Sequence, residues 1–378
     1  MKTKKIVIVF GTRPEAIKMA PVIIELNKHS DYFETIVIVT AQHREMLDQV
    51  LQVFKITPDW DLNIMKKNQS LSDITIEVLK DIESIFKKEL PDMVLVHGDT
   101  TTSFSAALAA YYQRIPIGHV EAGLRTYDHD NPFPEEGNRQ LIDNLSDLFF
   151  APTEVTKQNL IKENKPSDRL VVTGNTVIDA IHYTRNVKVE HSVLNLMKSK
   201  SEQKWILLTM HRRENYGEPM KNVFKGVVEL TERYQNVEFL MPVHLSPIVQ
   251  ELAREVLGDN DRIHLVKPLE VNVFHKVINK SYLVLTDSGG LQEEAPALDK
   301  PVLVLRNKTE RPEGLEAGTL RLIGTSKEAV FSEVSNLLDN EKEYNKMAQS
   351  ENPYGDGLSS KRIINKIKEY FDSKPLEK

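Results

Sequence analysis

KKIVIVFGTRPEAIKMAPVIIELNK, residues 4–28, joins a short apolar run to a longer amphipathic segment. The run at 4–10 is rich in Val and Ile and nearly continuous, which is typical of a strand covered on both faces. The segment at 15–28 has the apolar spacing of a helix, and Pro14 suits a first helical position. A strand followed by a helix is the repeating unit of a parallel sheet, so this stretch predicts an α/β fold.

The same alternation continues along the chain. Helical patterns such as residues 71–90 separate most of the further apolar runs. Twelve strands are many for one open sheet, and the polar stretch 175–204 lacks a clear strand, so we place a hinge near its start. The sequence therefore predicts two doubly wound, Rossmann-like parallel-sheet domains. The eleven further runs lie at 34–40, 93–98, 115–120, 147–151, 169–174, 204–210, 237–243, 262–266, 281–287, 301–305 and 319–324.

The composition restricts the class of protein. A chain of 378 residues allows two or three domains, and 40% hydrophobic with 28% charged residues is ordinary for a globular protein. The absence of Cys excludes disulfides, thiolate metal sites and cysteine nucleophiles. A formal charge of −6 gives no support to nucleic-acid binding. The first apolar run is too short for a signal peptide and no run could span a membrane, so we expect a cytoplasmic protein without membrane insertion.

Six polar motifs share one position, because each follows the end of a predicted strand. Open parallel sheets bind ligands at the carboxyl ends of their strands. Two such sheets facing each other would gather all the motifs in one cleft. The motifs are GTRPEAIK, GDTTTS, EAGLRT, HRREN, DSGGLQEEAP and RNKTERPEG.

The second predicted domain carries candidates for binding a nucleotide diphosphate. Ser288, Gly289 and Gly290 lie between a strand and a helix, where free amide groups favour a phosphate, although a plain tight turn has the same composition. Glu294 either bonds ribose hydroxyls or is a solvated helix residue. Arg311 either pairs with a phosphate oxygen or lies on the surface.

Cations from both predicted domains could surround one dianionic group. Arg13 and Lys18 lie at the first strand-to-helix turn, and His211 and Arg311 follow strands of the second domain. Each of them alone could be a solvated side chain. Neither GxGxxG nor a Walker loop is present, so the chain has no fingerprint for a nicotinamide cofactor or ATP.

Several acids could carry proton transfer, and each has a structural alternative. Asp99 ends a strand but could cap the next helix, and Glu121 ends another, where burial would raise its pKa unless it pairs with Arg125. Glu135 follows a rigid Asn-Pro-Phe-Pro but could simply begin a helix. His211 could be a satisfied, partly buried histidine.

A metal site has little support in the sequence. The acids of DHD, residues 128–130, are hard ligands, but no zinc or EF-hand spacing is present. We therefore expect a site without a metal or cofactor, and interpret Glu136 and the DHD acids as structural or solvent-facing.

Eight motifs together resemble the non-hydrolysing UDP-N-acetylglucosamine 2-epimerases of bacteria, in the same order through nearly the whole chain. That resemblance implies the GT-B architecture, with a C-terminal helix returning to the first domain. It implies domains at 1–174 with 358–378 and at 175–357. The motifs are GTRPEAIKMAP, VHGDTTT, HVEAGLRT, NPFPEEGNRQ, TMHRREN, TDSGGLQEEAP, TERPEG and NPYGDG.

The resemblance also implies a reaction. Members interconvert UDP-GlcNAc and UDP-ManNAc by eliminating UDP to give 2-acetamidoglucal and adding it back on the other face, supplying ManNAc donors for cell-surface polysaccharide. Carboxylates suit an oxocarbenium-like sugar, and cations suit the departing diphosphate. No cofactor is implied, and a homodimer is.

The functional residues carried over by the resemblance fall into two groups. Asp99, Glu121, Glu135 and His211 match catalytic positions. The positions that match UDP contacts, with Phe274 beside uracil, are Arg13, Lys18, Phe274, Ser288, Gly290, Glu294 and Arg311.

Many bacterial members bind a second UDP-GlcNAc as an activator. Gln42, Arg212 and His244 match that allosteric site, but this chain has Glu45 and Asn68 where Gln and Arg are expected. Both differences weaken attraction for a diphosphate, so we expect weaker or altered activation.

Three other functions remain open from the sequence. A hydrolysing 2-epimerase would release free ManNAc and UDP. A GT-B glycosyltransferase would need a UDP site and an acceptor groove, and a non-catalytic nucleotide-sugar binding protein would leave the acids unexplained.

Overall fold

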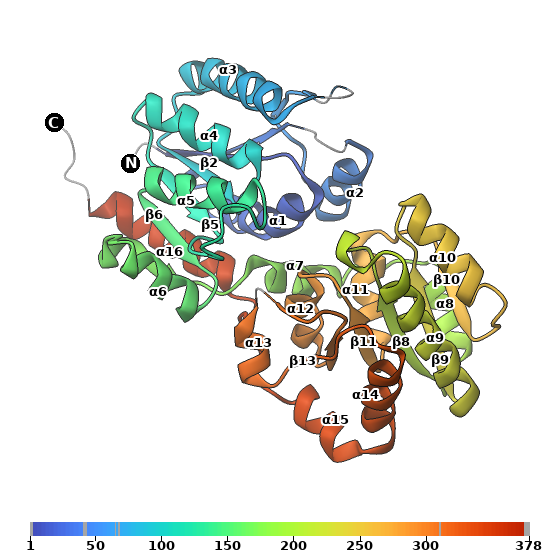
Figure 1. Cartoon of the computed structure of the whole chain (residues 1–378). Helices are drawn as coiled ribbons and strands as arrows, with labels where there is room; N and C mark the ends of the chain where they lie inside the picture. The colour runs from blue at the N-terminus through green and yellow to red at the C-terminus, as the bar shows by residue number, and fades with distance from the viewer. Residues whose placement is uncertain (1–2, 41–43, 65, 67–68, 310, 374–378) are drawn as a thin grey trace. The chain divides into compact units, whose positions relative to one another are not determined.

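The computed structural model describes residues 3–40, 44–64, 66, 69–309 and 311–373. The chain forms two compact units: unit 1 comprises Met1–Tyr183 and Gly355–Lys378, and unit 2 comprises Thr184–Tyr354. Each unit is a parallel sheet with helices packed against it (Figure 1). The predicted limits of independently folding domains stay predictions.

Unit 1 has a seven-stranded parallel sheet in the order β3-β2-β1-β4-β5-β6-β7. Its strands are β1 Lys4–Phe10, β2 Phe33–Val39, β3 Trp60–Asp61, β4 Met93–His97, β5 Ile117–Val120, β6 Leu148–Ala151 and β7 Leu170–Val172. Its helices are α1 Arg13–Asn27, α2 Arg44–Phe54, α3 Leu71–Glu89, α4 Thr101–Tyr112, α5 Glu135–Leu145, α6 Glu154–Lys162, α7 Thr176–Thr184 and α16 Ser359–Asp372.

Unit 2 has a six-stranded parallel sheet in the order β10-β9-β8-β11-β12-β13. Its strands are β8 Lys204–Thr209, β9 Val237–Pro242, β10 Ile263–Val266, β11 Leu283–Thr286, β12 Val302–Val304 and β13 Leu320–Leu322. Its helices are α8 Ser192–Ser199, α9 Glu218–Arg233, α10 Pro247–Leu257, α11 Val271–Lys280, α12 Leu291–Glu294, α13 Pro312–Ala317, α14 Lys327–Asp339 and α15 Glu341–Ala348.

The predicted α/β class is confirmed, and every predicted apolar run contains a strand. The sequence missed β3, a two-residue strand that pairs Trp60 and Asp61 with the end of β2. A segment that short has no hydrophobic period to detect. The strand order reverses between β1 and β4 and between β8 and β11. Four of the six motifs follow these strands, and the other two follow β5 and β12, the next strands in each sheet.

The starts of α1 and α4 are joined by one buried carboxylate. Glu15 closes a capping box with Thr12, the N-cap residue of α1. Its second oxygen accepts hydrogen bonds of 2.7 Å from Thr100 Oγ1 and 2.9 Å from Ser103 Oγ. Because Thr100 caps α4, Glu15 fixes two helix starts at the same edge of the sheet.

Helix α16 packs against α1 within unit 1 (Figure 1, red and blue). Ile363, Ile364 and Ile367 are fully buried, and Tyr32 donates a 2.7 Å hydrogen bond to Asp372. The last described helix therefore completes the first unit. Within the described residues, no helix combines the length and apolar character needed to cross a membrane.

Gly123→Ala is expected to lower the free energy of unfolding by about 2–5 kcal/mol. Gly123 has a φ of +84°, and a Cβ there would lie 2.3 Å from the backbone oxygen of Thr156 and 2.9 Å from Leu160 Cγ. The matched control is Gly137→Ala in α5, where nothing lies within 4 Å of the new Cβ. That change should stabilise the helix by about 0.5–1 kcal/mol. Urea unfolding compares the two, and equal effects would contradict the expectation.

Candidate active site

Glu121 lies in a buried cluster of side chains at the end of β5. Its Oε2 atom forms an ion pair with Lys18 Nζ from α1 and accepts a 2.9 Å hydrogen bond from Asn175 Nδ2. Nε2 of His97, the last residue of β4, lies 3.7 Å from the same oxygen. The side chains of Lys18 and Glu121 are only 12% and 11% exposed, so water screens the pair weakly.

The expectation that burial raises the pKa of Glu121 is wrong. Burial does favour the neutral acid, but the charge of Lys18, followed by His97, outweighs it and holds the pKa well below its usual range. The alternative of an ion pair with Arg125 is also wrong. Glu121 is a carboxylate anion at neutral pH, which suits it to stabilising positive charge.

Arg125 belongs instead to a buried network beside this loop. Its NH2 atom lies 2.7 Å from Asp143, and its Nε and NH2 atoms donate to the two oxygens of Glu163 at 2.7 and 2.6 Å. His119 contacts both parts of this network. Its Nδ1 atom lies 2.6 Å from Asp143 Oδ1, and its Nε2 atom lies 2.7 Å from the carbonyl oxygen of Gly98. The network ties together the loops after β4 and β5, which carry two of the candidate acids.

Asp99 follows β4 and pairs with Arg139 of α5. Asn138 of the same helix donates a 2.9 Å hydrogen bond to the backbone oxygen of Asp99. The alternative of a helix cap is wrong for Asp99, because Thr100 is the N-cap residue of α4 and accepts from the Ser103 N–H. The carboxylate therefore helps to hold α5 against the loop after β4.

The two glutamates that begin α5 differ in their surroundings. Glu136 is buried and accepts hydrogen bonds from the backbone N–H groups of Thr126 and Tyr127 at 3.0 and 3.1 Å. Glu135 is half-buried, and its side chain has no hydrogen bond or ion pair with another described residue. Glu136 thus holds the preceding loop in place, whereas Glu135 is available to a ligand.

The sheet brings two predicted catalytic acids to one edge. His97 and Val120 are partners in the parallel β4–β5 ladder. Glu121 follows Val120 directly and Asp99 lies two residues after His97. Arg139 links Asp99 to the helix that Glu135 begins.

Asp287 organises the loop after β8 in unit 2. The side chain is fully buried. It accepts from the backbone N–H of His211 at 3.0 Å and of Arg212 at 2.9 Å, and from Asn215 Nδ2 at 3.0 Å. One carboxylate at the end of β11 therefore fixes the loop that follows the neighbouring strand.

His211 is held between an acid and a second histidine. Its Nδ1 atom lies 3.4 Å from Asp287, and its ring stacks on that of His244 with centroids 5.5 Å apart. Partial burial lowers its pKa, opposed by the charge of Asp287. His211 is therefore neutral at pH 7, although its side chain remains 37% exposed.

Ser288 and Gly290 form the turn between β11 and the short helix α12. Ser288 N–H donates a 2.9 Å hydrogen bond to Thr286 Oγ1. Glu294 ends α12 with a side chain that is 17% exposed, 3.6 Å from Nε2 of His275, so it is not a solvated helix residue. Phe274 precedes that histidine on α11 and is half-buried.

Arg311 is not a solvated surface residue. Its Nε atom donates a 2.7 Å hydrogen bond to Glu293, a buried acid on α12. Tyr354 accepts a 3.2 Å hydrogen bond from the Gly314 N–H on the following helix. The bond to Glu293 holds Arg311 against α12, the helix that follows the turn of Ser288 and Gly290.

Sequence reasoning missed three residues with contacts in these groups: His97, Asn175 and Asp287. His97 and Asp287 stand inside motifs quoted above, and a buried carboxylate after a strand could have marked Asp287. Asn175 gave no signal, because its partner Glu121 is 54 positions away.

The residues that match the allosteric site are only partly within the described part of the chain. Gln42 and Asn68 lie outside the described residues, as does the side chain of Glu45, whereas Arg212 and His244 lie in unit 2. The described residues contain no group of three His, Asp or Glu able to hold a metal ion.

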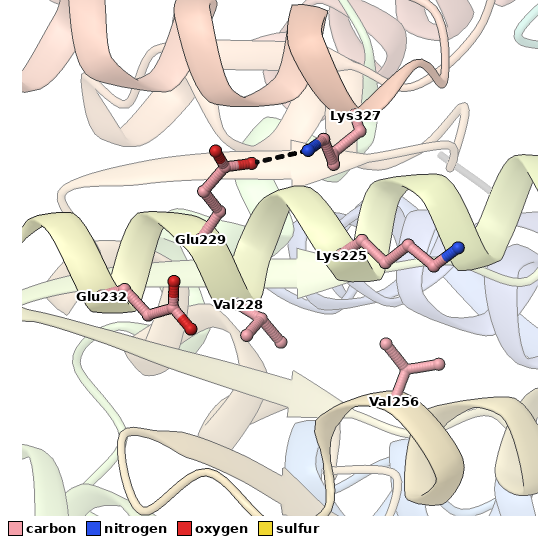
Figure 2. A pocket seen from close by; sticks show the side chains of 6 residues that line it. All are labelled: Lys225, Val228, Glu229, Glu232, Val256 and Lys327. Carbon is pink, nitrogen blue, oxygen red and sulfur yellow. Dashed lines mark ion pairs between the residues drawn. The ribbon is translucent and has the colours of Figure 1, made fainter.

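A pocket of about 380 Å³ lies elsewhere on unit 2 (Figure 2). A Glu229–Lys327 ion pair of 3.2 Å crosses one side of it. None of the predicted site residues is in its lining, which consists of Lys225, Val228, Glu229, Glu232, Val256 and Lys327.

Comparisons with known proteins agree over nearly the whole chain. The family model described as UDP-N-acetylglucosamine 2-epimerase matches residues 24–368. The UDP-N-acetylglucosamine 2-epimerase of Bacillus subtilis (strain 168) is 54% identical over 367 residues, covering 97% of this chain and 96% of the relative.

Two solved structures are also similar. The structure of a UDP-N-acetylglucosamine 2-epimerase described as putative, from Listeria monocytogenes, has a TM-score of 0.92 at 51% identity and covers 99% of this chain and 98% of its own. The UDP-GlcNAc 2-epimerase of Neisseria meningitidis, bound to UDP-GlcNAc, has a TM-score of 0.89 at 49% identity and covers 97% and 100%. These likenesses confirm the predicted GT-B fold class.

Proposed function

The chain belongs to the UDP-N-acetylglucosamine 2-epimerase family, and from that premise we propose that it interconverts UDP-GlcNAc and UDP-ManNAc. The Neisseria meningitidis relative was solved with UDP-GlcNAc bound, which supports the same substrate here. The observation that carries the proposal is the buried Glu121 anion, held by Lys18 and Asn175 beside the loop of Asp99. A binding protein would have no use for it.

The proposed reaction eliminates UDP and adds it back. The bond from carbon 1 to the phosphate oxygen breaks, and its electron pair leaves with UDP. A base removes the proton at carbon 2, and the electron pair of that C–H bond becomes the double bond of 2-acetamidoglucal. Addition of UDP with a proton delivered to the other face of carbon 2 gives the epimer.

The candidate residues divide between the two tasks. Glu121 stabilises positive charge on the sugar because it stays ionised. Proton transfer belongs to Asp99 and Glu135, of which Glu135 has the free side chain. Contacts to UDP belong to Arg13, Lys18, His211, Phe274, Ser288, Gly290, Glu294 and Arg311.

NMR spectroscopy in heavy water tests the function. UDP-GlcNAc is incubated with the protein and EDTA, without added cofactor. UDP-ManNAc with deuterium at carbon 2 is the expected product. Free ManNAc with UDP would favour a hydrolysing epimerase, and transfer to an added acceptor without exchange would favour a glycosyltransferase. Tight binding without turnover would favour a binding protein.

Binding of UDP at pH 7 is expected to take up part of a proton. The pKa of His211 is lowered in the free protein, mainly by burial, and a diphosphate beside it would raise that pKa again. Calorimetry in two buffers of different ionisation enthalpy measures the uptake. His211→Asn should abolish it, and an unchanged buffer dependence in that variant would contradict the role of His211.

Allosteric activation by UDP-GlcNAc is expected to be weak, because Glu45 and Asn68 reduce the attraction for a diphosphate. UDP-ManNAc should then be turned over without added UDP-GlcNAc. The double variant Glu45→Gln with Asn68→Arg should restore dependence on the activator. A sigmoidal rate curve in the unmodified protein, with UDP-ManNAc inert until UDP-GlcNAc is added, would contradict this.

A homodimer and a cytoplasmic location stay predictions. The neighbouring helices α3 and α4 carry exposed apolar side chains, with Ile76 62%, Tyr111 56% and Tyr112 65% exposed. Exposed apolar side chains of this size favour self-association. Light scattering would give twice the mass of the chain, and a monomer mass would end the proposal.

A further inference from the structure

His97 is a buried histidine that the reaction outlined above does not use. It closes β4, and its side chain is only 5% exposed. Neither Nδ1 nor Nε2 has a hydrogen-bond partner within the described part of the chain. Buried polar atoms are nearly always paired, so an unpaired ring at the edge of a candidate site calls for an explanation.

The ring faces the carboxylate of Glu121. Nε2 lies 3.7 Å from Glu121 Oε2, the oxygen that also contacts Lys18 and Asn175. His97 and Val120 are register partners in the β4–β5 ladder, so the backbone fixes how close the ring and the carboxylate lie. The sheet thus aims a ring nitrogen at the carboxylate without closing a hydrogen bond.

A purely structural role would not need a histidine at this position. The four preceding residues of β4, at 93–96, are apolar and fully buried. An apolar side chain would continue that pattern without leaving two ring nitrogens unpaired. The histidine therefore makes the fold less stable than an apolar residue at position 97 would, which is typical of a functional site.

We propose that His97 is a positioning residue for the reaction at carbon 2, which orients the Glu121 carboxylate. This rests on the proposed function, because it assigns His97 to the same site. Donation from Nε2 toward Oε2 would complete the contacts that Lys18 and Asn175 begin. The other oxygen of Glu121 is then directed toward the substrate.

Two substitutions test the proposal in the full chain. His97→Leu should lower kcat by about 10- to 100-fold, whereas His97→Gln, whose amide can donate from a similar place, should retain most of it. The groups that lower the pKa of Glu121 are Lys18 from α1 and His97 from β4. Loss of the donor at position 97 raises the pKa of Glu121. The acidic limb of the pH–kcat profile should therefore move to higher pH in the Leu variant but not in the Gln variant, whose amide can donate.

The dissociation constant for UDP, measured by calorimetry, should stay within about twofold, which separates loss of positioning from loss of fold. His264→Leu is the matched control, since its Nε2 lies 2.6 Å from Glu238 outside the candidate site. It should keep kcat and the pH profile. If His97→Leu does not fold, His97→Asn replaces it, because that amide is too short to reach Glu121 and should behave in the same way.

Unchanged kcat and pH profile in the Leu or Asn variant would overturn the proposal. So would a Gln variant as slow as the Leu variant with no shift of the acidic limb, because the ring would then serve packing alone. Failure of the unmodified protein to exchange the carbon-2 proton would contradict the proposed function itself, and the assignment of His97 would fall with it.

Discussion

Glu121→Gln is expected to lower kcat by about 10²- to 10³-fold. Glutamine keeps the shape and size of the side chain but removes the negative charge that the structure maintains by placing Lys18 and Asn175 against it. Stabilisation of a positive sugar ring depends on that charge. The NMR exchange assay gives kcat, and a variant with more than a tenth of the normal rate would contradict the role of Glu121.

The same substitution should also lower the free energy of unfolding by about 3 kcal/mol, because it leaves a buried ammonium without its anion. Lys18→Met combined with Glu121→Gln removes both charges and should regain most of that stability. Activity should not return in the double variant. Urea unfolding measures the first effect and the exchange assay the second. Recovery of both together would mean that Glu121 acts only through stability.

Asp287→Ala is expected to lower kcat/KM by about 100-fold and the free energy of unfolding by about 2–4 kcal/mol. The substitution leaves the N–H groups of His211 and Arg212 and the amide of Asn215 without their shared acceptor. The loop after β8 would then lose the geometry that sets His211.

Asp339→Asn is the control for that experiment. Asp339 accepts a 2.7 Å hydrogen bond from Tyr234 at an exposed position of the same unit. Its replacement should change stability by less than about 0.5 kcal/mol and leave kcat/KM alone. Steady-state kinetics and urea unfolding are measured on both variants. An Asp287→Ala protein with normal kcat/KM would show that the loop needs no carboxylate.

The positions of the strands and motifs were accessible from the sequence. Continuous apolar runs such as those at 4–10 and 204–210 indicate strands that are buried on both faces. They locate the ends of these strands to within a few residues. The rule that ligands bind at the carboxyl ends of parallel strands then singled out the segments containing Asp99, Glu121 and Ser288. None of this required knowledge of contacts between distant residues.

The partners of the charged residues were not accessible. Sequence reasoning offered Arg125, four positions away, as an alternative partner of Glu121, but the structure pairs Glu121 with Lys18, which is 103 positions away. It considered Asp99 as a helix cap, but Asp99 pairs with Arg139. The predicted direction of the Glu121 pKa was wrong for the same reason, since burial could be inferred locally and the compensating cation could not.

The sequence by itself therefore determined the α/β class, the twelve longer strands and the segments that carry the candidate site, because hydrophobic period and turn composition are local properties. Only the tertiary structure decided which charges meet: Lys18 with Glu121, Arg125 with Asp143, and Asp287 with the loop of His211. Strand order places these residues together, and strand order follows from how all the helices and strands of a unit pack at once.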